Sequence, residues 1–219
     1  MGKIFTKEEF QDAVDNELAW RKKELKIFKD LVPSDNSPKG KALLRCSIPI
    51  FYAHWEGFVK KSCEYYLEYV SNKKEKFCNL KPQFITLAAT KHIGKFEITK
   101  IEDKTKLIKF IIENLNEESN IYTKKAIRTK ANLRYDIFKD ICFLLDIDIN
   151  MFSKHEFIIN DLVDTRNTIA HGEEHNVKFQ QFDNFYLDVT SLLEKLRTEL
   201  ENAVALDKHK IQAIIHKTY

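Results

Sequence analysis

Three polar residues in the C-terminal third of the chain could act together on a phosphate ester: Arg166, Asn167 and His171. An imidazole such as that of His171, with an ordinary pKa near 6.5, can take up or return a proton near neutral pH. The planar guanidinium of Arg166 could hold two phosphate oxygens at once. Asn167 could orient His171 or donate to a phosphate oxygen. The three residues therefore predict acid–base chemistry at a phosphate.

Helical spacing would bring these residues close to one another. Positions 158, 159, 162, 163, 166, 169 and 170 share one broad helix face, and all but Arg166 are apolar. A guanidinium on such a face needs a partner or a function. Asn167 and His171 are four residues apart and stack on a neighbouring face. Arg166 and His171 differ by about 140° and about 7.5 Å, a gap that the long arginine stem can close.

A purely structural interpretation of the same residues stays open. Gly172 is a natural helix-ending residue, and His171 would then lie where the helix dipole favours a cation. An arginine followed by a histidine four to six residues later also arises often by chance. His171 and His175 are spaced like metal ligands, but Gly172 should break the helix between them. No metal site is predicted.

The composition indicates the elements that must position these residues. The 219 residues include only five Gly and four Pro, which predicts long helices and few connections. Sixteen Phe and eight Tyr supply large side chains for helix packing. We expect a single all-α domain, a bundle of six or seven helices. Residues 1–33 form an N-terminal helix, 34–40 a linker, and 41–216 the helical domain that packs with that helix.

Local signals predict where several helices begin. Thr6 and Glu9 form a capping box at the start of the first helix, which should stop before Pro33. The helix over 41–70 is apolar around much of its circumference and should be the central one, with a kink or a late start at Pro49. Further helices are expected over 82–89 and 104–115, from a cap at Asn132, from a second capping box at Ser153–Glu156, and from Asn176.

Nothing in the sequence predicts a membrane protein. The most apolar stretch, Leu43–Trp55, is interrupted by Arg45 and Pro49 and is shorter than the roughly 18 residues that a span needs. The N-terminus lacks the apolar segment of a signal peptide. The four cysteines form no CxxC pair, so we expect reduced thiols in helix interiors and a cytoplasmic protein. The net charge of +3 is only a weak argument for an anionic partner.

Three blocks of the sequence occur in the order seen in one known family. They are Arg166-Asn167-x-x-Ala170-His171-Gly172, Tyr52-Ala53-His54-Trp55-Glu56-Gly57-Phe58 and Asn132-Leu133-Arg134-Tyr135. Together they resemble the HEPN superfamily, in particular a prokaryotic branch of ribonuclease-like toxins. The resemblance covers roughly residues 41–200.

This resemblance implies an all-α endoribonuclease that uses neither a metal nor another cofactor and acts on RNA as a homodimer, with its motifs facing each other. Arg166, Asn167 and His171 would be its catalytic residues. RNA carries its own nucleophile, the 2′-hydroxyl, so cleavage needs only a base, an acid and a cation. The resemblance further implies a role as a toxin or in phage defence, with an antitoxin or regulatory protein as a candidate partner.

Four further residues are candidates for substrate binding or for support of the site: Arg45, His54, Glu56 and Glu173. The alternative for those in the central helix is a satisfied polar contact in the core. Glu173 stands where HEPN toxins silenced by a nucleotidyltransferase often carry a tyrosine, so that form of regulation is not expected. The remaining histidines have structural explanations: a capping turn for His155, and surface positions for His92, His209 and His216.

Two other classes of function stay open. One is a HEPN-like bundle that binds RNA or a nucleotide, or that dimerises, without cutting. The other is a structural protein–protein module in which Arg166 and Asn167 hold a dimer together.

Overall fold

The computed structural model describes all residues except 1–2, 36, 94–99, 122, 124–125 and 212–219. The described residues form seven α-helices and two short 3₁₀ helices, with two isolated β-bridges and no strand. The single all-α domain of six or seven helices is thereby confirmed. The helices are α1 Lys7–Leu31, α2 Pro38–Asn72, α3 Pro82–Ile93, α4 Ile101–Glu113, α5 Tyr135–Leu145, α6 Glu156–Ala170 and α7 Phe179–Ala205, with η1 Phe77–Asn79 and η2 Ile149–His155.

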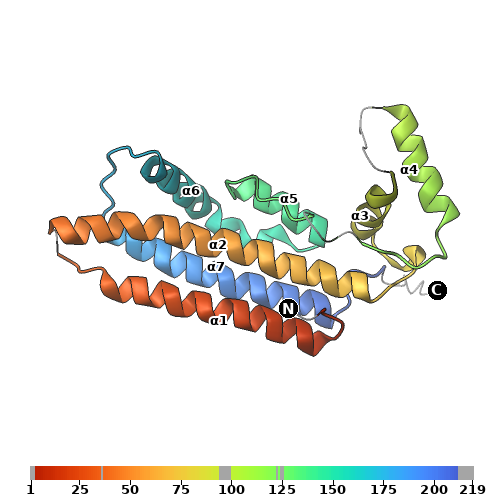
Figure 1. Cartoon of the computed structure of the whole chain (residues 1–219), viewed down its shortest axis with the longest axis horizontal. Helices are drawn as coiled ribbons and strands as arrows, with labels where there is room; N and C mark the ends of the chain where they lie inside the picture. The colour runs from red at the N-terminus through yellow and green to blue at the C-terminus, as the bar shows by residue number, and fades with distance from the viewer. Residues whose placement is uncertain (1–2, 36, 94–99, 122, 124–125, 212–219) are drawn as a thin grey trace, which may run out of the picture.

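The long helices α1, α2 and α7 lie side by side and form the body of the molecule (Figure 1). Helices α5 and α6 lie on the other side of α2 from α1, and α6 packs directly on α2. Helices α3 and α4 pair with each other at one end. Helix α2 is therefore the central element, with α1 on one side and α6 on the other.

The first capping box is present as predicted. The Thr6 hydroxyl accepts from the Glu9 N–H at 3.1 Å, and the Glu9 carboxylate accepts from the Thr6 N–H at 3.0 Å. The expected linker over 34–40 is too long at its C-terminal end. Helix α2 already begins at Pro38, because the Ser37 hydroxyl accepts from the Gly40 N–H and proline suits the first helical position. The expected domain end at residue 216 lies outside the described residues.

Helix α2 runs through Pro49, so the late start considered above is wrong. Proline removes one backbone hydrogen bond, and packing against α1, α6 and α7 supports the remaining turns. The helix carries the centre of the core. Trp55 is fully buried with its ring 5.0 Å from Phe138, and Phe138 lies 5.0 Å from Phe152 in a second edge-to-face pair.

The second capping box, at Ser153–Glu156, is not formed. Ser153 belongs to η2, and its hydroxyl donates to the carbonyl of Asn150 at 2.9 Å. Helix α6 begins at Glu156 without a side-chain cap. His155 is buried instead of capping, and its Nδ1 lies 3.0 Å from a carboxylate oxygen of Asp188 on α7. A tertiary contact has replaced the local one.

Two other helices start later than expected. Helix α5 begins at Tyr135 after Arg134, not at a cap made by Asn132, and α7 begins at Phe179, not at Asn176. When several polar residues precede a helix, the sequence does not determine which of them is the cap, so the predicted first residue can be wrong by several positions.

All four cysteines are free, but only Cys63 and Cys142 are buried, whereas Cys46 and Cys78 are exposed.

The surface position expected for His209 is wrong. The side chain is fully buried, with its ring 6.3 Å from Tyr69 and 6.3 Å from Phe84. Its carbonyl accepts from the Lys81 N–H at 2.9 Å, which holds the segment after α7 against the start of α3. His216 and the side chain of His92 lie outside what the structure describes.

Burial lowers the pKa of His209 to about 4, from an ordinary value of 6.5. The unfolded chain then binds more protons than the folded chain as the pH falls below 6.5, so the folded state loses stability down to about pH 4. Between pH 7.5 and 5.0 this loss amounts to about 2 kcal/mol. We expect His209→Phe to remove it, as measured by urea unfolding at both pH values.

Burial also lowers the pKa values of His54 and His155. Both residues are present in parent and variant, so their contribution to the pH dependence is the same in both and the difference reports His209. An identical pH dependence in parent and variant would contradict the assignment to His209.

Candidate active site

The Arg166 side chain is held from three sides. Its guanidinium carbon lies 4.0 Å from the centre of the Tyr52 ring on α2. Nη2 donates to the carbonyl of Ala131 at 2.8 Å, and Nη1 donates to Oδ1 of Asn167 at 2.7 Å. A guanidinium has five N–H donors, so donors remain for the oxygens of a bound anion. Arg166 thus has its partners although it stands on the apolar face of α6, and the residue is only half-buried.

The segment before α5 supplies that carbonyl because its backbone turns back at two successive residues. Lys130 and Ala131 both have positive φ, 52° and 60°. Such angles are unfavourable for residues with a Cβ, so surrounding contacts must maintain them. The Tyr52 hydroxyl contributes, because it accepts from the Leu133 N–H at 2.8 Å and donates to the Ala131 carbonyl at 3.4 Å.

Tyr52 is a functional candidate that the spacing argument missed. It is 3% exposed, and burial raises the pKa of its hydroxyl. Its ring supports the Arg166 guanidinium while its hydroxyl fixes the segment at 131–133. The signal that could have found it is its position at the start of the block over 52–58, because the family resemblance rests on that block together with the motif.

The start of α5 is attached to α6 beside the motif. The Arg134 guanidinium forms an ion pair with both carboxylate oxygens of Asp164, and the Tyr135 N–H donates to Oδ1 of Asn160 at 3.1 Å. The three sequence blocks, far apart along the chain, therefore meet around Arg166.

His171 lies at the C-terminal end of α6, as the spacing predicted. Gly172 follows with φ 79°, and its N–H donates to the carbonyl of Ile169. The Glu173 N–H donates to the carbonyl of Thr168, which completes a Schellman motif. Within the described residues the exposed imidazole of His171 makes no hydrogen bond. The structure joins Arg166 to Asn167 directly and leaves the imidazole one turn further on, free to meet a ligand.

Arg45 and Glu173 meet through the backbone. Nη2 of the half-buried Arg45 donates to the carbonyl of Glu173 at 2.6 Å, and Nη1 donates to the carbonyl of His175 at 3.5 Å. The Glu173 side chain itself is exposed. Arg45 therefore fastens the segment that follows His171 to the central helix.

His54 and Glu56 are separated by the helix that carries them. His54 is buried against α1, with Nε2 3.0 Å from a carboxylate oxygen of Glu24 and its ring 5.3 Å from Trp20. The α1 side is remote from α6, so His54 does not join the site. Glu56 is half-buried one turn after Tyr52, and its negative charge adds to the effect of burial in raising the Tyr52 pKa.

Within the part of the chain that the structure describes, no group of three or more His, Cys, Asp or Glu side chains is placed to hold a metal ion. In the same residues, no helix combines the length and apolar character that crossing a membrane requires.

Tyr52 offers a test of how the site is held together. Tyr52→Phe removes the acceptor of the buried Leu133 N–H and keeps the ring, which should lower the free energy of unfolding by about 1–2 kcal/mol. The Leu133 amide should exchange with solvent about tenfold faster, measured by native-state hydrogen exchange. Tyr65→Phe, on the same helix with its hydroxyl toward Glu17 of α1, is the matched control. Equal exchange at Leu133 in both variants would refute this role.

A family model described as RiboL-PSP-HEPN matches residues 16–202 of the chain. The match includes all three blocks and most of α1. A search of the curated proteins and a search of the solved structures each found no match.

Proposed function

This chain belongs to the RiboL-PSP-HEPN family, and from that membership together with the geometry we propose that it is an endoribonuclease. HEPN domains are generally associated with ribonuclease activity. The observation that carries the proposal is the Arg166 guanidinium, fixed by Ala131 and Asn167, with the exposed His171 five residues further along the chain at the end of the same helix. Cleavage of an RNA phosphodiester requires a cation that stabilises the developing charge and an accessible group that transfers a proton, and these two residues can supply both.

In the proposed reaction the 2′-hydroxyl oxygen attacks the adjacent phosphorus while an imidazole of the motif removes its proton. Charge that develops on the non-bridging oxygens is stabilised by the remaining N–H donors of Arg166, which Asn167 keeps in orientation. The bond from phosphorus to the 5′-oxygen then breaks, and that oxygen receives a proton from an imidazole. The products are a 2′,3′-cyclic phosphate and a 5′-hydroxyl. No step in this scheme calls for a metal.

We propose further that the active form is a homodimer with the two motifs facing each other. One chain offers one motif histidine, whereas a base and an acid are best supplied by two groups. Sedimentation velocity should show a dimer at the concentrations at which RNA is cleaved. Cleavage by a species that sediments as a monomer would overturn the dimer and leave the ribonuclease proposal intact.

The ribonuclease proposal is tested by incubating the purified protein with total RNA and with transfer RNA in EDTA, beside His171→Ala. We expect cleavage by the parent only, with 2′,3′-cyclic phosphate ends. Binding of RNA by both proteins without cleavage would overturn the proposal in favour of a binding module. A dimer that dissociates on Arg166→Ala and has no affinity for RNA would identify a structural module instead.

In a bacterial cell we propose a toxin or phage-defence role, exerted on cytoplasmic RNA and controlled by an antitoxin or regulatory partner. Its support is the family membership. Expression of the parent, but not of His171→Ala, should arrest growth of a bacterial host. Equal growth with both proteins would contradict this role.

A further inference from the structure

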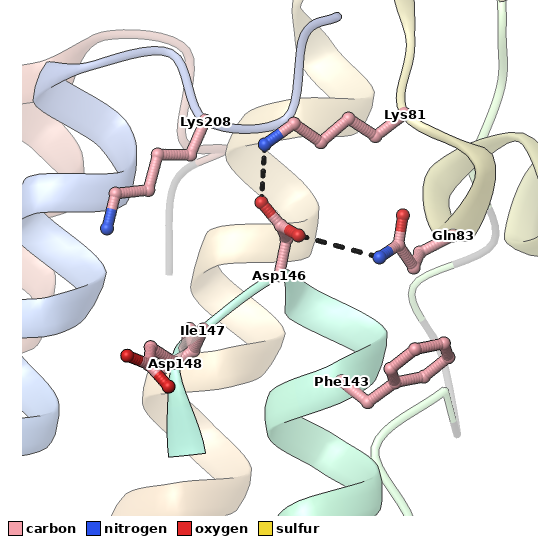
Figure 2. A pocket seen from close by; sticks show the side chains of 7 residues that line it. All are labelled: Lys81, Gln83, Phe143, Asp146, Ile147, Asp148 and Lys208. Carbon is pink, nitrogen blue, oxygen red and sulfur yellow. Dashed lines mark hydrogen bonds and ion pairs between the residues drawn. The ribbon is translucent and has the colours of Figure 1, made fainter. Parts of the chain in front are cut away.

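Helix α5 connects the candidate active site with a second hollow at the far end of the helix. Its first residues are attached to α6 by the Arg134–Asp164 ion pair. At its other end Asp146, with φ 56°, accepts from Lys81 Nζ at 2.5 Å and from Gln83 Nε2 at 3.5 Å (Figure 2). The eleven residues of α5 span about 17 Å, which is several nucleotides of a single strand.

The hollow nearer to the motif has a volume of about 320 Å³ and lies between α5 and the segment 126–130. Apolar side chains of α5 line it, and Arg128, Lys130 and Asp140 are its charged residues. Lys130 directly precedes Ala131, whose carbonyl holds Arg166. This hollow therefore begins one residue away from a contact of the proposed catalytic arginine.

The second hollow, of about 530 Å³, lies between the end of α5, the start of α3 and the segment after α7. Lys81, Lys208 and Asp148 are among its lining residues, and Figure 2 shows these side chains around Asp146. Phe143 lines both hollows and is 72% exposed. An exposed aromatic ring thus forms the ridge between two hollows that each carry two basic side chains.

We propose that single-stranded RNA runs along α5, continuing from the phosphate held at Arg166. One base occupies the apolar hollow, a following base stacks on Phe143, and phosphates lie near the basic side chains of both hollows. This inference rests on the proposed ribonuclease function and names how that site holds its substrate.

Single-strand binding surfaces combine basic side chains that follow the backbone with aromatic rings on which bases of any sequence stack. Both parts are present here, in continuity with the motif. The hollows together carry four basic and three acidic side chains. Lys81 is paired with Asp146, and Lys208 Nζ lies 3.9 Å from a carboxylate oxygen of Glu199. The carboxylates of Asp140 and Asp148 can accept hydrogen bonds from exocyclic amines of bases. This mixture of charged and apolar side chains fits a partner that carries both phosphates and bases, such as a nucleic acid strand, better than it fits a protein partner with an apolar surface.

The test compares two exposed phenylalanines. Phe143→Ala should weaken binding of a ten-nucleotide single-stranded RNA about tenfold, because a base loses its stacking partner. Phe157→Ala, on α6 and 79% exposed, lines neither hollow and should leave the affinity unchanged. Fluorescence anisotropy is measured in the His171→Ala background so that the RNA is not cut.

Substrate length and salt sharpen the test. Phe143→Ala should leave cleavage of a dinucleotide at the parental rate while raising KM for the ten-nucleotide RNA. Lys208→Gln and Lys130→Asn should each reduce the slope of the logarithm of the binding constant against the logarithm of the salt concentration by about one. Asparagine is chosen at position 130 because it tolerates the positive φ there.

Unchanged affinity in Phe143→Ala, while the parent still cleaves RNA, would overturn the α5 path alone. A parent that neither binds nor cleaves RNA would overturn both this inference and the proposed function. A change of oligomeric state in Phe143→Ala, seen by sedimentation, would assign the ridge to a protein contact and overturn the path as well.

Discussion

Replacing His171 by alanine is expected to lower the rate of RNA cleavage about a thousandfold, the middle of the range that a positioned acid or base contributes. The free energy of unfolding should change by less than about 0.5 kcal/mol, because the side chain is exposed and makes no hydrogen bond within the described residues. Single-turnover cleavage at saturating protein concentration measures the rate, and urea unfolding measures the stability.

His175→Ala is the matched control for this loss. His175 is four residues further on, where Arg45 holds its backbone carbonyl, and it lies beyond the helix end at Gly172. Its removal should leave cleavage close to the parental rate. If His171→Ala cleaved as fast as the parent, the imidazole would be only a helix-end residue and the mechanism would be wrong.

Arg166→Ala should lower cleavage about 100- to 1000-fold, as expected for loss of a donor that stabilises charge in the transition state. Unlike the change at His171, it should also lower the free energy of unfolding by about 1–2 kcal/mol. The bond to the Ala131 carbonyl and the contact with the Tyr52 ring are both lost. Arg166→Lys keeps the charge without the planar guanidinium and should cleave RNA less than about tenfold faster than Arg166→Ala.

Arg134→Ala separates the role of Arg166 from a general effect of removing an arginine nearby. Arg134, which directly precedes α5, pairs with Asp164 on α6, the helix that also carries Arg166. Both side chains of this pair are partly exposed, and Arg134 is not one of the three proposed catalytic residues. Its loss should cost less than about 1 kcal/mol of stability and little activity. Hydrogen exchange at Leu133 shows whether the segment beside Arg166 stays in place in each variant. Parental cleavage by Arg166→Ala would refute the assignment of the catalytic cation.

Much of the fold could be predicted because it depends on local interactions. A threonine three residues before a glutamate caps a helix through bonds within one turn, so the start of α1 at Lys7 followed from its own residues. The end of α6 followed from Gly172, since a positive φ is easiest for glycine. The scarcity of Gly and Pro predicted long helices, because turns and strand ends use these residues and few of them are available for connections. The long helices and the order of the motif residues were thus determined by the sequence alone, whereas the 3₁₀ helices η1 and η2 were not predicted.

Contacts between distant segments could not be predicted, because periodicity indicates that a face is covered but not by what. Arg166 meets a carbonyl 35 residues earlier in the chain and an aromatic ring on α2. His209 stands between two lysines, Lys208 and Lys210, and is nevertheless buried, because the chain after α7 lies against the start of α3.

The block over 52–58 shows the same division most clearly. Tyr52 and His54 are two residues apart, which places them on nearly opposite sides of a helix. The sequence therefore determined that only one of them could face the motif. The packing of α1 on one side of α2 and of α6 on the other decided that it is Tyr52, because helix faces are assigned by the burial of whole surfaces and not by single residues.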